Sequence, residues 1–146
     1  MMFTSSNDRK VVVLDLYQAK LNVEEDKFTV VLLTAWSESG AQEILYSGLI
    51  EKLLSDGVAN FVCVGKFSEY LHDEIDELIY HFDEKHGTEL VTKVVTTFHE
   101  GEALEDSVNY FIYGSEIHDR GDEKLLAVLN LNHSEDSKVV SVLKSA

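Results

Sequence analysis

Five short runs rich in valine, leucine and phenylalanine constrain the fold of this sequence more than any other feature. Three of the runs are nearly continuous in apolar residues instead of alternating with polar ones. Continuity of this kind is typical of strands that are buried on both faces, as in a parallel sheet covered by helices. We therefore predict strands at 11–17, 28–36, 60–65, 90–98 and 124–132.

Helical patterns lie between the later runs. The first helix is expected to begin at Ser39, with Gln42 completing a capping box, and to end at Gly57. A second helix is expected over 68–87, with Ser68 as its N-cap and Gly87 as its C-terminal stop. A third is expected at about 102–113, and both have an apolar stripe at helical spacing. The end of the chain is compatible with a fourth helix, although its valines also allow a strand.

The lengths of the connections suggest how the strands pair. Only about ten residues separate the first two predicted strands, whereas a parallel crossover usually needs a dozen or more residues. The first strand is therefore expected to pair antiparallel or to lie at an edge. The rest is a series of βα units, so we predict a single α/β domain over 1–146, with a mostly parallel five-stranded sheet between two layers of helices.

The strong negative charge restricts the partners. The chain has 27 acidic and 12 basic residues, a formal net charge of −15. Such a charge repels the phosphates of nucleic acids and the anionic surfaces of membranes, and it attracts cationic partners. We expect a basic protein partner, no nucleic acid and no membrane, with solubility alone as the alternative explanation.

Cysteine use and the N-terminal stretch indicate the compartment. Cys63 is the single cysteine, so neither an internal disulfide nor a zinc site with paired cysteines is expected. The N-terminal residues lack the apolar core of a signal peptide, and no run approaches the ~20 apolar residues of a membrane span. We expect a soluble cytoplasmic protein without a cofactor.

The stretch EYLHDEIDELIYHFDEKHG, at 69–87, holds seven acidic residues and three of the six histidines. A metal site is disfavoured here, because His72 and Asp76 would lack further ligands from the same helix. Two interpretations remain open: a solvated outer face, or a docking face for a basic protein with an aromatic anchor. The residues expected to bind the partner form the stripe Asp73, Asp76, Glu77, Tyr80 and Glu84.

A second candidate site follows from the predicted topology. Open α/β sheets bind ligands beyond the carboxyl ends of their strands. Serines at a helix start suit a small anion, and His99 with Glu100 is a candidate base with its orienting acid, although adjacent residues usually point apart. A metal would require His99, His118 and His133 to converge, and none is expected. The candidate ligand-binding residues are Ser37, Ser39, Gly40, Lys66, His99, Glu100 and His133.

Dinucleotide, P-loop and G-x-S-x-G motifs are all absent from the sequence. The sequence therefore favours a non-enzymatic acidic protein that docks a basic protein partner. One form of such a protein is an inhibitor or immunity-type protein that masks a toxin or nuclease. The alternative is a small Rossmann-like ligand-binding protein or enzyme that uses the crevice at the strand ends.

Overall fold

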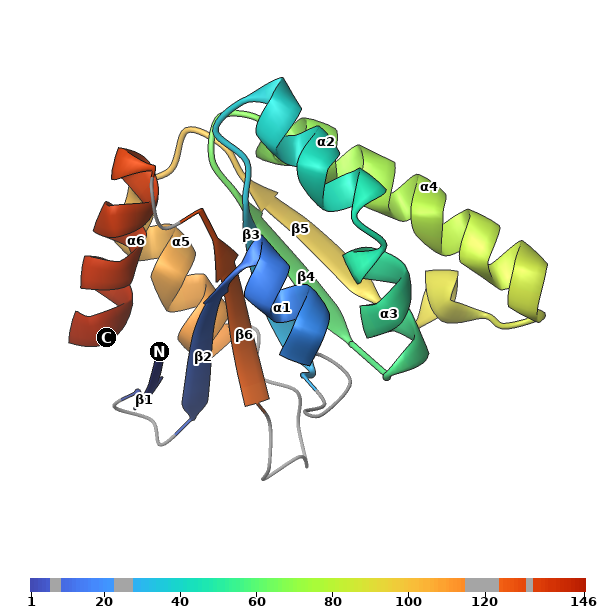
Figure 1. Ribbon diagram of the computed structural model, residues 1–146, viewed down its shortest axis with the longest axis horizontal. Coiled ribbons are helices and arrows are strands. Elements are labelled where there is room, and N and C mark those ends of the chain that lie inside the picture. Colours follow the sequence, from blue (N-terminus) through green and yellow to red (C-terminus); the bar gives the residue numbers. More distant parts are fainter. Residues whose placement is uncertain (6–8, 23–27, 115–123, 131–132) are drawn as a thin grey trace.

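The computed structural model describes residues 1–5, 9–22, 28–114, 124–130 and 133–146. The strands of these residues form one six-stranded sheet in the order β1-β2-β6-β3-β4-β5 (Figure 1). Neighbouring strands run parallel, except that β1 and β2 are antiparallel. The strands are β1 Met2–Thr4, β2 Lys10–Asp15, β3 Val30–Thr34, β4 Asn60–Val64, β5 Val95–His99 and β6 Lys124–Leu129.

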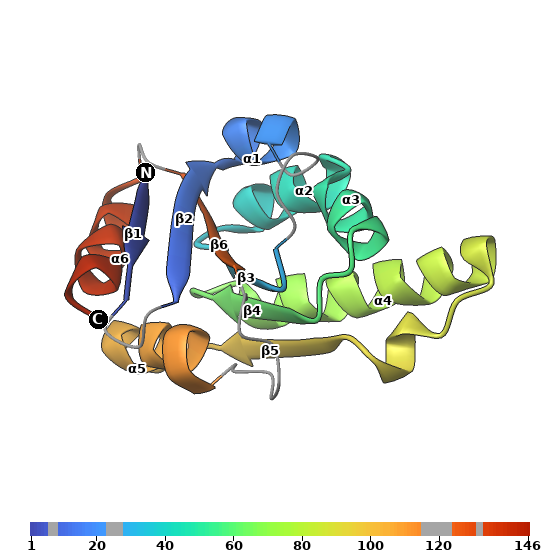
Figure 2. The same cartoon turned by 90° about the horizontal axis from the view of Figure 1, so that it is seen from below.

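Helices cover both faces of the sheet (Figure 2). Val31 and Phe61 point to the face covered by α1, α2, α3 and α4, whereas Val30 and Val62 point to the face covered by α5, η2 and α6. Because β3 and β4 are buried along their whole length, their continuous apolar runs are explained. The helical elements are α1 Leu16–Asn22, α2 Glu38–Tyr46, α3 Leu49–Ser55, α4 Ser68–His86, the 3₁₀ turn η1 Leu90–Thr92, α5 Leu104–Asn109, the π-helical turn η2 Tyr110–Gly114 and α6 Ser134–Ser145.

The predicted fold class, a mostly parallel sheet between two layers of helices, is confirmed. The pairing of the first predicted strand needs a correction. This strand, β2, pairs in parallel with β6. Its antiparallel partner is β1, a short strand that was not predicted and that takes the edge. The reason is that β2 ends at Asp15 and β3 begins only at Val30. The connection is therefore longer than expected and contains α1, which allows a parallel crossover.

Two helix starts also differ from the prediction. The first helix begins earlier by two residues, because Ser37 and not Ser39 is the N-cap and accepts the backbone N–H of Gly40 at 3.0 Å. It is also divided into α2 and α3 by Gly48, whose φ of 83° lies in the left-handed region. Ser68 does not cap α4: it lies inside the helix with its side chain buried. Gly87 ends α4 in a left-handed conformation, as predicted.

The strand order creates a switch point near the middle of the sheet. Strand β3 continues into α2 on one face, whereas its neighbour β6 leads to α6 on the opposite face. The chain therefore diverges at the carboxyl ends of these two strands. Open α/β sheets bind ligands in the crevice that such a divergence leaves.

Candidate functional site at the switch point

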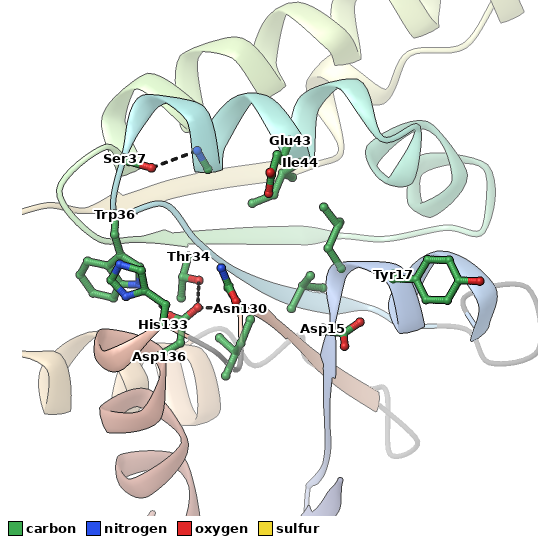
Figure 3. Close-up of a pocket in the computed structure, with 14 residues that line it drawn as sticks. Asp15, Tyr17, Thr34, Trp36, Ser37, Glu43, Ile44, Asn130, His133 and Asp136 are labelled. Atoms are coloured by element: carbon green, nitrogen blue, oxygen red, sulfur yellow. Dashed lines mark hydrogen bonds between the residues drawn. The ribbon is translucent and has the colours of Figure 1, made fainter.

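A cavity of about 290 Å³ lies at the carboxyl ends of β2, β3 and β6 (Figure 3). It opens between α2, which covers one face of the sheet, and α6, which covers the other. Its wall combines apolar side chains with polar ones from several separate segments. The lining residues are Asp15, Leu16, Tyr17, Thr34, Trp36, Ser37, Gly40, Glu43, Ile44, Val128, Leu129, Asn130, His133 and Asp136.

The side chain of Asp136 is fully buried at this cavity and accepts three hydrogen bonds. Its Oδ1 accepts the indole N–H of Trp36 at 2.6 Å. Its Oδ2 accepts the hydroxyl of Thr34 at 3.0 Å and the backbone N–H of Asn130 at 2.6 Å. Three donors compensate for the loss of hydration of the carboxylate. Asp136 therefore connects α6 to the ends of β3 and β6 and fixes the orientation of Trp36.

Trp36 and His133 form an aromatic wall. Their ring centroids are 6.3 Å apart and their planes differ by 14°, which is within the range of offset stacking. The Nδ1 atom of His133 accepts the backbone N–H of Glu135 at 3.1 Å, at the start of α6. A neutral His133 therefore carries its proton on Nε2 and can donate a hydrogen bond from that atom.

The charges of the lining residues restrict the ligand. Asp15 accepts the backbone N–H of Gln18 at 2.8 Å, near the start of α1, and Glu43 is exposed on α2. With Asp136, three carboxylates line the cavity, and no lysine or arginine is among its described lining residues. Negative charge at short range disfavours an anion and suits a neutral or positively charged ligand.

The serines at the start of α2 are already engaged with each other and with the helix. The hydroxyl oxygen of Ser37 accepts the N–H of Gly40 and lies 3.2 Å from the hydroxyl of Ser39. One of the backbone donors that an anion would use is therefore satisfied by the N-cap. The start of α2, like the three carboxylates, therefore disfavours an anionic ligand.

A second cavity, of about 420 Å³, lies at the carboxyl ends of β4 and β5. His99 lines it, and its Nδ1 lies 2.7 Å from Oε2 of Glu102. Since an ionised carboxylate only accepts, Nδ1 carries a proton, and Nε2 of the neutral ring accepts the hydroxyl of Thr97 at 3.1 Å. His99 therefore has an orienting carboxylate, but it is Glu102 and not the adjacent Glu100.

The structure divides six of the seven candidate ligand-binding residues between the two cavities. Trp36 lines both cavities, and Ser39 lines neither. Ser37 therefore does not share a cavity with Lys66 or His99. The first cavity contains Ser37, Gly40 and His133, and the second contains Lys66, His99 and Glu100.

Sequence reasoning missed the residues that organise the site. Thr34 is the one polar residue of the buried strand β3, and this position could have indicated a buried hydrogen-bond partner. Asp136 lies in the first turn of α6, where an acidic residue is ordinary. Its burial depends on contacts with residues 100 positions away, so no local signal identified it.

The acidic stripe of α4 faces solvent. The side chains of Asp73, Asp76, Glu77 and Glu84 are between 53% and 70% exposed, and Tyr80 is 54% exposed. A hydrogen bond to Glu84, together with the charge of that carboxylate, raises the pKa of Tyr80, which remains a neutral phenol at physiological pH. The stripe therefore presents four carboxylates around one aromatic side chain.

Three further observations on the described part of the chain concern metal ligands, membrane spans and the single cysteine. Within it, no group of three His, Cys, Asp or Glu side chains is placed to hold a metal ion, and His118 lies outside it. None of its helices has the length and apolar character needed to cross a membrane. Burial raises the pKa of the Cys63 thiol, which stays protonated and is therefore a poor nucleophile.

Comparison with known proteins places the chain in a family. The family described as Domain of unknown function (DUF7684) matches residues 11–146. Of the described strands, this range omits β1 and the first residue of β2, and it includes all lining residues of both cavities. No curated protein and no solved structure matches the chain.

Proposed function

We propose that this chain, which belongs to the DUF7684 family, binds a small neutral or positively charged molecule in the cavity at the carboxyl ends of β2, β3 and β6. The observation that carries the proposal is the position of the cavity at the switch point of the sheet, where open α/β folds bind ligands. A volume of about 290 Å³ is at the lower end of the range of small-molecule sites.

The composition of the wall supports a small organic cation with an apolar body. Ile44 and Leu129 are buried apolar residues of the wall. Trp36 adds an aromatic ring whose orientation is fixed by Asp136. Aromatic faces attract cations, and the carboxylates of Asp15 and Glu43 add to this attraction.

Trp36 makes the proposal directly testable. It is the single tryptophan of the chain and it lines the cavity, so a bound ligand should change its fluorescence emission. We would titrate the protein with matched sets of small molecules that share an apolar body and differ in charge, such as benzylamine, benzyl alcohol and benzoate. The amines and the neutral analogues should change the emission at lower concentrations than the carboxylates.

Two charge reversals provide the variant and its control. Glu43→Lys places a positive charge at the cavity and should weaken amine binding by about tenfold. Glu74→Lys makes the same change at an exposed position of α4 that lines neither cavity, and it should leave amine binding unchanged. Stronger binding of the carboxylates, or a broad set of amines and neutral molecules without any effect on Trp36, would contradict the proposal.

A second function, docking of a basic protein partner, is supported by the four exposed carboxylates around Tyr80 on α4. Exposed carboxylates on one side of a helix speed the approach of a cationic surface. A protein of this kind could act as an inhibitor or immunity-type protein that masks a basic toxin or nuclease.

Docking can be tested without knowing the partner. A fluorescent lysine-rich peptide should bind the wild-type protein at a rate that falls as salt is added. The triple variant Asp73→Lys, Asp76→Lys and Glu77→Lys should slow this association. The triple variant Glu89→Lys, Glu105→Lys and Asp106→Lys has the same net charge and changes exposed residues elsewhere. Equal rates for the two variants would show that net charge alone attracts the peptide.

A further inference from the structure

In the described part of the chain, no strand pairs with the outer edge of β5. Strand β5 is the last strand of the sheet order and pairs with β4 on one side only. The backbone N–H of Val95 donates to Ala59 at 2.9 Å, so Val95 faces β4. Because backbone groups alternate along a strand, Thr97 and His99 also face β4, and the N–H and C=O groups of Thr96 and Phe98 point outward.

Two of the five side chains of β5 are apolar and exposed. Val95 is 52% exposed and Phe98 is 42% exposed. Edge strands are usually protected from pairing with other chains by lysine, proline or a bulge. None of these occurs in the five residues of β5, and the register with β4 is continuous from Val95 to His99. The edge therefore retains the features that allow another strand to pair with it.

Acidic side chains lie directly beside this edge. Nε2 of His72, on α4, donates a hydrogen bond to the carbonyl oxygen of Thr96 at 3.1 Å, and the imidazole ring contacts Phe98 edge-on. Around the same imidazole, Asp73 lies 2.9 Å from Nδ1 and Asp76 lies 3.7 Å from Nε2. A strand added to β5 would therefore pass close to the acidic stripe of α4.

We propose that the edge of β5 binds an extended, positively charged segment of a partner protein by strand addition. The inference rests on the docking function proposed above and specifies the kind of partner segment that would dock. The Thr96 carbonyl already accepts from His72, so backbone hydrogen bonds to the N–H of Thr96 and to the N–H and C=O of Phe98 would hold the segment. Its lysine or arginine side chains would face the carboxylates of α4. Peptides recognised in this way gain affinity from the backbone and specificity from alternate side chains.

Charge argues against a second copy of the chain as the occupant. Antiparallel pairing of two β5 edges about a two-fold axis would place both copies of α4 on the same face of the joined sheet. The acidic stripes would then approach each other, and each chain already has a net charge of −15. A basic segment avoids this repulsion.

Protection of backbone amides from hydrogen exchange distinguishes strand addition from electrostatic attraction alone. We would add a peptide of alternating lysine and valine to the protein. The control is a peptide of the same length and charge in which two valines are replaced by prolines. The alternating peptide should slow hydrogen exchange at the backbone amides of Thr96 and Phe98. Binding without any protection of these amides would overturn strand addition and leave docking on α4 intact. Absence of binding by both peptides would contradict docking and strand addition together.

Substitutions at Phe98 provide an independent test. Phe98→Lys and Phe98→Glu both remove the exposed aromatic side chain, and only the lysine repels a basic segment. Phe98→Lys should weaken binding of the alternating peptide by about tenfold relative to Phe98→Glu. Equal affinities of the two variants, or a concentration-dependent wild-type dimer that Phe98→Lys dissociates, would overturn the proposal.

Discussion

The indole N–H of Trp36 donates a 2.6 Å hydrogen bond to the carboxylate of Asp136, a residue 100 positions later in the chain. The bond connects the end of β3 to the first turn of α6 across the mouth of the candidate site (Figure 3). The geometry of the aromatic wall therefore depends on a side chain of the last helix. Ligand binding and the stability of this helix should consequently be linked.

Asp136→Asn keeps the shape of the side chain and removes its charge. The amide group can accept from some of the three donors but presents its own N–H₂ to the others. We expect a loss of about 2 kcal/mol in the free energy of unfolding, as is usual for hydrogen bonds to a buried charged group. Urea unfolding followed by circular dichroism measures this loss. Glu135→Gln is the control, because Glu135 pairs with Lys138 at the surface.

Gly65 and Gly48 form a matched pair for testing backbone strain. Both have a positive φ, 113° and 83°, respectively. A Cβ on Gly65 would lie 2.5 Å from the carbonyl oxygen of Ala35, whereas a Cβ on Gly48 would meet nothing within 4 Å. Gly48→Ala should cost about 1–2 kcal/mol of stability from its left-handed backbone alone. Gly65→Ala should cost more, because its Cβ would also clash with the carbonyl oxygen of Ala35. Equal losses of stability in the two variants would show that the backbone at Ala35 moves away from the new Cβ without cost.

The carboxylate of Asp83 should titrate at a low pH. Partial desolvation acts to raise its pKa, but hydrogen bonds from the hydroxyl of Thr88 and from the backbone N–H groups of Val91 and Leu90 lower it below its usual value of 3.8. Because the folded pKa is lowered, the stabilisation is fully present above pH 3.8 and is lost as the pH falls through the folded pKa.

The amide proton shifts of Leu90 and Val91 measure this titration by NMR. In the wild-type protein they should change with a midpoint below pH 3.8. In Asp83→Asn this titration should disappear. A wild-type midpoint at or above 3.8 would show that the hydrogen bonds do not favour the charged form.

Charge reversal of Asp73, Asp76 and Glu77 should leave the fold intact. All three side chains face solvent, so the free energy of unfolding should change by less than about 0.5 kcal/mol per residue. Ile75→Ala, on the buried side of the same helix, should instead cost about 2–5 kcal/mol. A large loss in the triple variant would show that the carboxylates have a structural role.

The sequence allowed the layered fold to be predicted, because continuous apolar runs such as 60–65 and the helical stripe of 69–87 are local patterns. The pairing of β2 was predicted incorrectly, since it depends on where Asp15 ends the strand and on α1. The candidate site was predicted in part. Ser37, Gly40 and His133 follow strand ends and could be identified, but Asp136 acquires its role from residues that approach it only in the folded chain.

The position of β6 between β2 and β3 has a consequence for folding during synthesis. Strand β6 is the last strand to be made, yet it separates the first two parallel strands, with Lys10 opposite Lys124. Pairing across such a sequence distance is slow, because the entropy of closing a long loop must be lost first. Before β6 emerges from the ribosome, one edge of β2 and one edge of β3 lack the strand with which they later pair. The nascent chain should therefore be most exposed to aggregation, and most dependent on chaperones, just before its last strand emerges.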